Sequence, residues 1–413
     1  MAHLKNQFRE FYAPKNMRKF LSFIPMETLD ALIEKYQADK WVQTLFTSNL
    51  IKLHLWVLLS KPRYITLRGV VRLSDNFLFK LFTGLNRLSP NGLSKANKDL
   101  DYHLFADLFH QLLFSLNKKT KKQLLGKFKI FDTTFLMLSL KLSPWSARCN
   151  GKGCVKLGIR IDEGSTLVNK VAIDTKNTND NSLFAEMIDF DLSSITYLFD
   201  RGFYTIEILE RIHKTQNFFI TRLSPFYAYR ILTDLPLPEL THELVLKTSS
   251  EGEFQIIKDQ IIQIGSKRTQ AQSLFRLITA QSQKGETLLF LTNRFDLPAT
   301  KVCEWYKHRW QIEILFKWLK QYLKINQFIS RSENGVMTQI YMTLIFHILL
   351  ILYREQTKSK TTLLETMSQL ANQIVNELIH ILFYQGILLG WWLALPLTPS
   401  STRKSPTLKS WGH

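Results

Sequence analysis

Residues 127–140 have the sequence KFKIFDTTFLMLSL, in which one acid, Asp132, stands among aromatic, β-branched and other apolar residues. A run of this composition predicts a buried β-strand. Burying an unpaired carboxylate is costly, because the charge loses its hydration. Asp132 is therefore a candidate for chemistry rather than for packing.

The residues that follow this strand predict an α/β core. Two alternating runs, 155–162 and 166–174, are joined by a turn at Glu163–Gly164 and predict a hairpin. Helix and strand then alternate, with a helix expected at 182–190, a strand at 195–200, a helix at 205–214 and a strand at 218–223. Three strands in a meander followed by alternating helix and strand indicate a ribonuclease-H-like core.

Further along, a β-rich segment interrupts this core. A proline-rich stretch at 235–240 opens a region that is strand-like from Glu243 to about Lys284, with turns at 251–252 and 265–266. A buried strand is predicted again at 287–292, and Pro298 begins a long helix that extends through Leu323. We expect one catalytic domain at 126–334 with a β-rich insertion at about 224–286.

Residues 1–125 predict a helical DNA-binding region. Apolar residues recur there every three or four positions, and the region holds 20 Lys and Arg against 9 Asp and Glu. The segment 88–100 (LSPNGLSKANKDL) has turn residues followed by Lys95 and Lys98, as in a small helix that reads DNA. A solvated loop with a charged helix face explains the same residues equally well.

The region 335–397 is expected to form helices that pack and dimerise. Its apolar stretches, 340–353 and 381–397, are shorter than the ~20 residues of a membrane span and contain polar breaks, so buried helices explain them better. Residues 398–413 are basic and rich in Ser, Thr and Pro, which is typical of a disordered tail. The resulting fold class is α/β, with a ribonuclease-H-like core between helical N-terminal and C-terminal regions.

The charge composition of the chain indicates which kind of molecule it binds. The 413-residue chain has 54 Lys and Arg against 34 Asp and Glu, a net charge of +20, and its 45% of hydrophobic residues excludes wholesale disorder. Such a surplus of positive charge favours nucleic acid, although a merely basic soluble protein or a membrane-surface protein fits the charge as well. Three cysteines and an N-terminus without an apolar signal segment suit a reducing cytoplasm, with no membrane partner.

The helix after Pro298 carries a polar stripe. On an α-helix, Tyr306, Arg309, Glu313 and Lys320 fall within about 60° of one another, opposite an apolar face. The stripe extends roughly 21 Å, comparable to several nucleotides of a DNA backbone. A solvated face with an Arg309–Glu313 pair is the ordinary explanation of such a stripe.

Two other acids strengthen the functional interpretation of the stripe. Asp132 lies inside the first strand, and Asp200 ends the short strand at 195–200, where its side chain can project from the sheet edge. Carboxylates brought together repel, and Mg²⁺ prefers oxygen ligands of this kind. Two such ions can activate a water or a 3′-hydroxyl and stabilise the leaving oxygen of a phosphodiester.

These residues resemble the insertion sequence 4 family of DDE transposases. The resemblance rests on Asp132-Thr133-Thr134, on Asp200-Arg201-Gly202-Phe203-Tyr204, and on the signature Y-x2-R-x3-E-x6-K, matched by Tyr306, Arg309, Glu313 and Lys320. It covers the chain from about Phe128 to Tyr322, including the β-rich insertion between the second Asp and the Glu.

The resemblance implies a cut-and-paste DNA transposase. Asp132, Asp200 and Glu313 would then be catalytic and hold two divalent ions, Mg²⁺ or Mn²⁺, while Tyr306, Arg309 and Lys320 would grip the phosphates of the transposon end. The partners implied are terminal inverted repeats, target DNA and a second copy of the chain in a synaptic dimer.

Two alternatives remain open. A ribonuclease-H-like DNA nuclease without strand transfer could share the carboxylates, although it does not need the stripe. A non-catalytic or domesticated DNA-binding protein could retain every one of these residues.

Overall fold

A computed structural model of the chain describes most of its length. The residues described are 14–60, 65–116, 128–149, 151–176, 180–237, 245–248, 252–282 and 284–394. The expected tail at 398–413 lies outside them.

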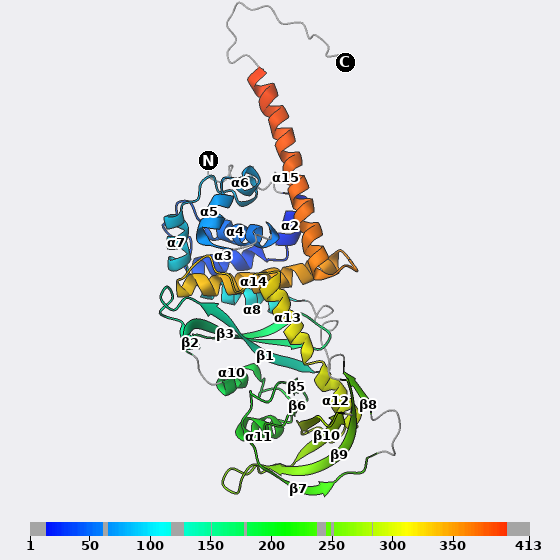
Figure 1. Cartoon of the computed structure of the whole chain (residues 1–413). Helices are drawn as coiled ribbons and strands as arrows, with labels where there is room; N and C mark the ends of the chain where they lie inside the picture. The colour runs from blue at the N-terminus through cyan, green and yellow to red at the C-terminus, as the bar shows by residue number, and fades with distance from the viewer. Residues whose placement is uncertain are drawn as a thin grey trace, which may run out of the picture.

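One large mixed sheet forms the lower half of the molecule in Figure 1. Its first strands are β1 (Lys129–Leu138), β2 (Ala147–Cys149), β3 (Lys152–Asp162), β4 (Val168–Asp174), β5 (Thr196–Leu198) and β6 (Phe218–Arg222). β1, β3 and β4 pair antiparallel, whereas β5 and β6 run parallel to β1 on its other side. The meander and the helix–strand alternation predicted for the core are therefore both present.

Helices cover both faces of these strands, because neighbouring side chains of a strand point to opposite sides. Phe131 of β1 packs against Phe184 of α10 (Asp180–Met187), with ring centroids 5.3 Å apart. Its neighbour Ile130 belongs to a different apolar cluster, which also contains Leu315 from the later helix α13 (Trp310–Gln321). α11 (Ile206–Lys214) shares the cluster of Phe131.

The β-rich segment extends the same sheet. Its strands are β7 (Tyr229–Asp234), β8 (Val245–Thr248), β9 (Gly252–Ile264), β10 (Phe275–Ser282) and β11 (Thr287–Thr292). β11 pairs with β6 on one side and with β10 on the other, so the inserted strands continue directly from the core. β7 was not predicted from the sequence, and all of its residues are exposed.

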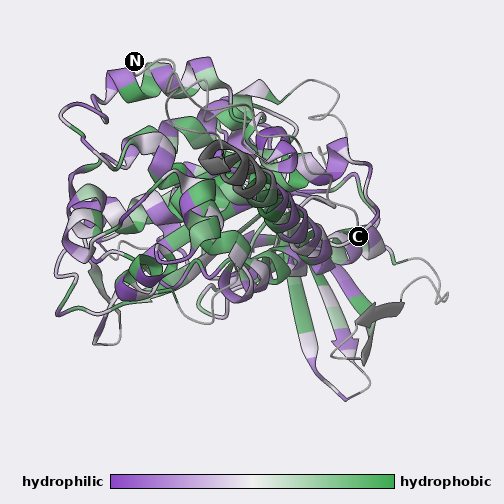
Figure 2. Cartoon of the chain, turned by 90° about the horizontal axis from the view of Figure 1, so that it is seen from above, coloured by the Kyte–Doolittle hydropathy of each residue, from purple (hydrophilic) through white to green (hydrophobic). Residues whose placement is uncertain are grey.

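The upper half is helical. It contains α2 (Lys15–Leu21), α3 (Met26–Lys35), α4 (Thr47–Ser60), α5 (Leu67–Leu73), α6 (Phe77–Thr83), α7 (Pro90–Asp99), α8 (His103–Ser115), α14 (Glu333–Gln356) and α15 (Leu363–Ala394). α14 lies between most of the N-terminal helices and the sheet. Seen from above, hydrophobic residues concentrate on the helices in the middle and hydrophilic residues lie toward the rim (Figure 2).

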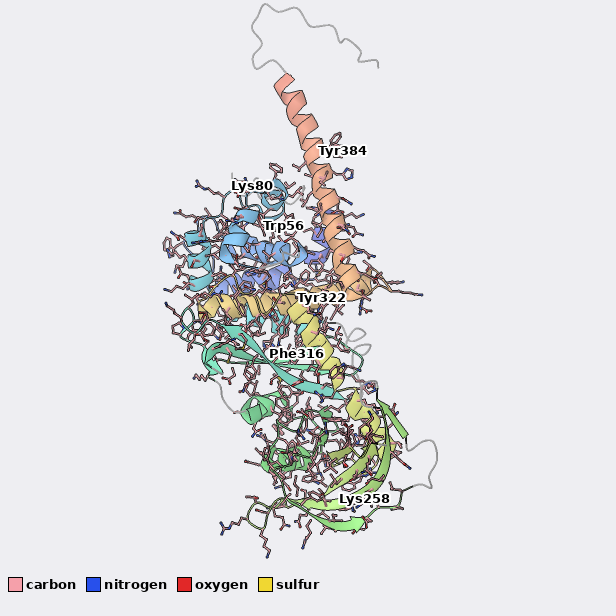
Figure 3. The ribbon with its side chains drawn as sticks, in the orientation of Figure 1. Trp56, Lys80, Lys258, Phe316, Tyr322 and Tyr384 are labelled. Atoms are coloured by element: carbon pink, nitrogen blue, oxygen red, sulfur yellow. The ribbon has the colours of Figure 1, made fainter. Side chains whose placement is uncertain are left out.

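The two apolar stretches of the C-terminal region behave differently. Among the described residues, α14 is long and apolar enough to cross a membrane, yet 94% of its apolar window is buried inside the protein. α15 instead extends away from the body, and on it Phe383 is 67% and Tyr384 65% exposed (Figure 3). The prediction of a buried helix from Ile381 is therefore wrong for these residues.

The helix predicted from Pro298 through Leu323 is two helices. α12 (Ala299–Lys307) ends at a tight turn, and α13 begins at Trp310 and ends at Gln321. At the junction, the amides of His308 and Arg309 donate to carbonyls three residues earlier rather than four. Such bonds tighten the helix locally.

Candidate active site

Strand register places the first two acids side by side. β1 and β5 are adjacent and parallel, and Ile130 is the partner of Leu198. Asp132 and Asp200 each follow their member of this pair by two residues, so they lie at the same level. Adjacent strands are about 4.8 Å apart, which brings the two carboxylates to one edge of the sheet.

Arg309 contacts both the third acid, Glu313, and the first, Asp132. Arg309 donates from Nη2 to Glu313 Oε1 at 2.7 Å and lies 3.5 Å from Asp132 Oδ2 through Nη1. Asp132 faces α13 because it is on the same side of β1 as Ile130. One guanidinium thus links the first and third acids.

The phenol of Tyr306 completes the contact with the second acid. Its hydroxyl donates to Asp200 Oδ1 at 3.4 Å, and the guanidinium carbon of Arg309 lies 5.9 Å from the centre of its ring. Burial raises the pKa of Tyr306 above its ordinary value. The hydroxyl therefore keeps its proton at neutral pH and acts as a donor.

Lys320 lies further along α13, opposite β1. Its ammonium donates to Thr134 Oγ1 at 2.5 Å, and Thr134 is two residues beyond Asp132 on the same face of β1. The polar stripe therefore faces the sheet instead of solvent. The Arg309–Glu313 pair of the ordinary explanation is present as well, but it lies inside the site.

The electrostatics of Asp132 reflect this crowding. Burial raises its pKa to about 6; the Thr133 amide, 2.7 Å from Oδ1, and the charge of Arg309 act in the opposite direction. The charges of Glu313 and Asp200 raise the pKa further. The three carboxylates are thus close enough to influence one another.

The donor set suits a hard divalent cation, which binds carboxylate oxygens. Within the part of the chain that the structure describes, no three His, Cys, Asp or Glu side chains are arranged to hold a metal ion. Instead, the Arg309 guanidinium lies among the carboxylates and partly neutralises them. By the chemistry of their donor atoms the acids suit such an ion.

The two lysines predicted to read DNA are not part of this constellation. Lys95 and Lys98 are exposed on α7, whose buried residues Leu93 and Asn97 face the protein. Asn334 at the start of α14 donates to the carbonyl of Lys98 and fixes the helix there. Their contact with DNA stays a prediction.

Two arginines, the buried Arg276 and the partly buried Arg294, were not anticipated as part of the site's surroundings. Arg276 lies on β10, and Arg294 lies in the segment before α12. An arginine within an apolar strand, such as Arg276, is visible in the sequence. Its partners could not be predicted, because they are distant in the chain.

Comparison with known proteins identifies the family. Residues 126–349, more than half of the chain, match the family described as the transposase DDE domain. The chain belongs to this family. It is a DDE transposase, an enzyme that cleaves DNA strands and transfers them, as the sequence predicted.

Several insertion-sequence transposases are similar to the chain. The y4zB transposase of Sinorhizobium fredii is 29% identical over 267 residues, covering 64% of this chain and 71% of that protein. The IS4SA transposase of Synechocystis is 26% identical over 293 residues, covering 70% and 78%. The IS231D transposase of Bacillus thuringiensis is 22% identical over 327 residues, covering 66% and 68%.

Among solved structures, the chain is similar to a piggyBac transposase synaptic complex with hairpin DNA. The TM-score is 0.48 and the identity 11%, with 94% of this chain and 84% of the other covered. The family membership confirms the resemblance to the insertion sequence 4 transposases and the predicted activity.

Proposed function

We propose that this transposase cleaves and joins transposon ends at the site formed by Asp132, Asp200 and Glu313. The observation that carries the proposal is the Arg309 guanidinium, which links Asp132 to Glu313 and lies beside the Tyr306 that contacts Asp200. Three acids distant in sequence converge in this way at one sheet edge.

The carboxylates would hold two divalent ions, Mg²⁺ or Mn²⁺. When bound, such ions supply an activated water or 3′-hydroxyl and neutralise the leaving oxygen. Burial raises the pKa of Asp132, and the charges of Glu313 and Asp200 raise it further. A divalent cation would offset this repulsion more fully than a single guanidinium does.

The stripe would bind the DNA backbone. Arg309 is 18% exposed, and a guanidinium released from the two carboxylates presents a planar pair of donors to a phosphate. Lys320 has its pKa lowered by burial, and its ammonium donates to a hydroxyl rather than to a carboxylate. Tyr306 holds its proton and can donate to Asp200 or to a phosphate oxygen. Lys95 and Lys98 on α7 would contact the terminal repeat further from the cut.

Cleavage of DNA that carries the flanking terminal repeats tests the triad. Glu313→Ala and Asp132→Ala should abolish Mg²⁺-dependent cutting, because each removes a carboxylate that no neighbour replaces. End binding, measured by gel shift, should stay within about twofold of wild type. Cutting at the wild-type rate by either variant would show that the triad is wrongly assigned.

A matched control lies one helix earlier. Glu304 on α12 is 52% exposed and pairs with Lys301. Glu304→Ala should cut as wild type does. Labelled DNA with free 3′-hydroxyl ends provides the second readout, since joined products are expected from a transposase and not from a nuclease that only cuts.

Two ends must be held together, and we propose a homodimer for this step. α15 leaves the body with exposed apolar side chains, Ile379 at 50% and Phe383 at 67%. A second copy can cover such a face. Phe383→Glu should lower the mass measured by light scattering from that of a dimer to that of a monomer; an unchanged dimer would place the interface elsewhere. The site of action is the DNA of the bacterial cytoplasm.

A further inference from the structure

The segment from Asn293 to Pro298 connects the last inserted strand, β11, to α12. α12 begins after Pro298, which provides no side-chain cap for the helix. Because Tyr306 lies in the last turn of the same short helix and Arg309 follows it, the position of this segment determines where the site's side chains lie. The contacts that hold it are therefore of functional interest.

Arg276 holds this segment from the inserted strands. Its guanidinium is 7% exposed and pairs with both carboxylate oxygens of Asp259 on β9, through Nε at 2.9 Å and Nη2 at 2.6 Å. The remaining nitrogen, Nη1, donates to the carbonyls of Arg294 at 3.0 Å and Leu297 at 2.6 Å. A single buried side chain thus joins β9, β10 and the start of α12.

Arg294 holds the segment from the core strands. Its Nη1 donates to Thr196 Oγ1 at 2.8 Å, and Thr196 is the first residue of β5, the strand that Asp200 follows. Its guanidinium carbon lies 4.3 Å from the ring centre of Phe218 and 5.6 Å from that of Trp305, the neighbour of Tyr306. Arg294 therefore spans the strand of the second acid and the helix of Tyr306.

These arginine contacts fix the geometry of the segment more than they add to the free energy of unfolding. A buried ion pair often contributes no more to stability than apolar side chains of the same volume. An arginine fork, in contrast, fixes direction, because its planar donors must match several acceptors at once. Four directed hydrogen bonds to two different elements constrain the start of α12 in a way that apolar packing does not.

We propose that Arg276 and Arg294 are positioning residues, and that the inserted strands brace α12 and α13 against β5. The brace consists of Asp259, Arg276 and the segment 293–298, which includes Arg294. It sets the distance between Asp200 and Tyr306 and, through α13, the placement of Glu313. The inference rests on the site proposed above.

Arg276→Lys tests the brace at its outer end. Lysine keeps the positive charge for Asp259 but lacks the fork that reaches both carbonyls. At temperatures where circular dichroism shows the variant folded, single-turnover cleavage should fall by roughly tenfold to a hundredfold, the size of effect expected from misplaced catalytic groups. The dissociation constant for end DNA should change less than twofold.

Hydrogen exchange gives a readout independent of activity. The amides of α12 and α13 should exchange faster in Arg276→Lys, while those of α14 keep their wild-type rates. Arg230→Lys is the matched control, since Arg230 is an exposed arginine of the same inserted strands that donates to Gln263. It should change neither exchange nor cleavage.

Arg294→Gln tests the inner end and leaves the Arg276–Asp259 pair in place, so it serves if Arg276→Lys fails to fold. It should reproduce the loss of cleavage rate with unchanged end binding. A variant that melts at a lower temperature but cuts at the wild-type rate, with unchanged exchange in α12 and α13, would overturn the proposal. These contacts would then stabilise the fold without positioning the site. If the wild-type site assignment itself fails, the exchange experiment still reports whether the brace orders α12.

Discussion

His347 offers a prediction whose size follows from the structure. It lies in the middle of α14 with no exposed surface, accepts from the Trp318 indole at 3.2 Å through Nδ1, and donates through Nε2 to the Thr166 carbonyl at 2.7 Å. Trp318 belongs to α13, so this ring connects the helix of Glu313 to the turn between β3 and β4. Burial lowers the pKa of His347 from 6.5 to about 4.

The direction of the pH effect follows from the two pKa values. Above pH 6.5 the ring is neutral in both the folded and the unfolded chain, and its contribution to stability is complete. As the pH falls from 6.5 toward 4, the unfolded chain takes up a proton that the folded chain refuses, so stability is lost. The loss is about 2 kcal/mol at pH 5 and about 3 kcal/mol below pH 4.

His347→Gln removes this proton uptake. At pH 7.5 the variant should be less stable by about 1–3 kcal/mol, because a glutamine amide cannot reproduce the imidazole geometry that serves both the Trp318 indole and the Thr166 carbonyl. At pH 5 the wild type has lost the ~2 kcal/mol assigned to this ring and the variant has not. The difference between the two proteins should therefore shrink by about 2 kcal/mol, measured by urea unfolding followed by circular dichroism at both pH values.

The exposed His380 on α15 provides the control, and His380→Gln should change the stability at pH 7.5 by less than about 0.5 kcal/mol. Parallel stability curves for wild type and His347→Gln between pH 7.5 and 5 would refute the reasoning. They would mean that the folded protein admits the proton at His347.

Two further predictions concern the site itself. Asp132→Asn should be inactive, yet more stable than wild type by about 1–3 kcal/mol at pH 8 with a chelator present. Burial raises the pKa of Asp132 to about 6, so the stability of the wild type falls as the pH rises from about 4 to 6. Urea unfolding at pH 8 and pH 4 measures the difference, and a gain in stability that persists at pH 4 would contradict the prediction. Arg309→Ala and Lys320→Ala should each weaken end binding and reduce the slope of log affinity against log salt by about one; slopes equal to the wild type in a titration of salt would show that neither side chain contacts a phosphate.

Some of the site could be predicted from spacing alone. The signature from Tyr306 to Lys320 has a helical spacing that places its four side chains together, and the strands around Asp132 and Asp200 have apolar patterns that define them. Local pattern determines such elements because helix and strand periodicity act over neighbouring residues. The local pattern did not predict β7, a strand whose residues are all exposed.

The turn at His308 and Arg309 could not be predicted from the local sequence pattern. Apolar spacing is continuous across it, so the sequence predicts one helix, while the structure divides it into α12 and α13. Packing of α12 against the inserted strands and of α13 against β1 requires the division. The stripe nevertheless faces the sheet: Tyr306 contacts Asp200, Arg309 contacts Asp132, and Lys320 contacts Thr134.

By itself the sequence determined the family and the order of the core strands along the chain, and it proposed the residues of the triad, since these depend on residue types and their spacing. The tertiary structure alone decided that Asp132 and Asp200 lie level, through the pairing of Ile130 with Leu198, and that Arg309 links the acids. It also decided that Arg276 reaches the start of α12. The physical reason is that contacts between residues far apart in the chain depend on strand register and helix packing, which no short window of sequence encodes.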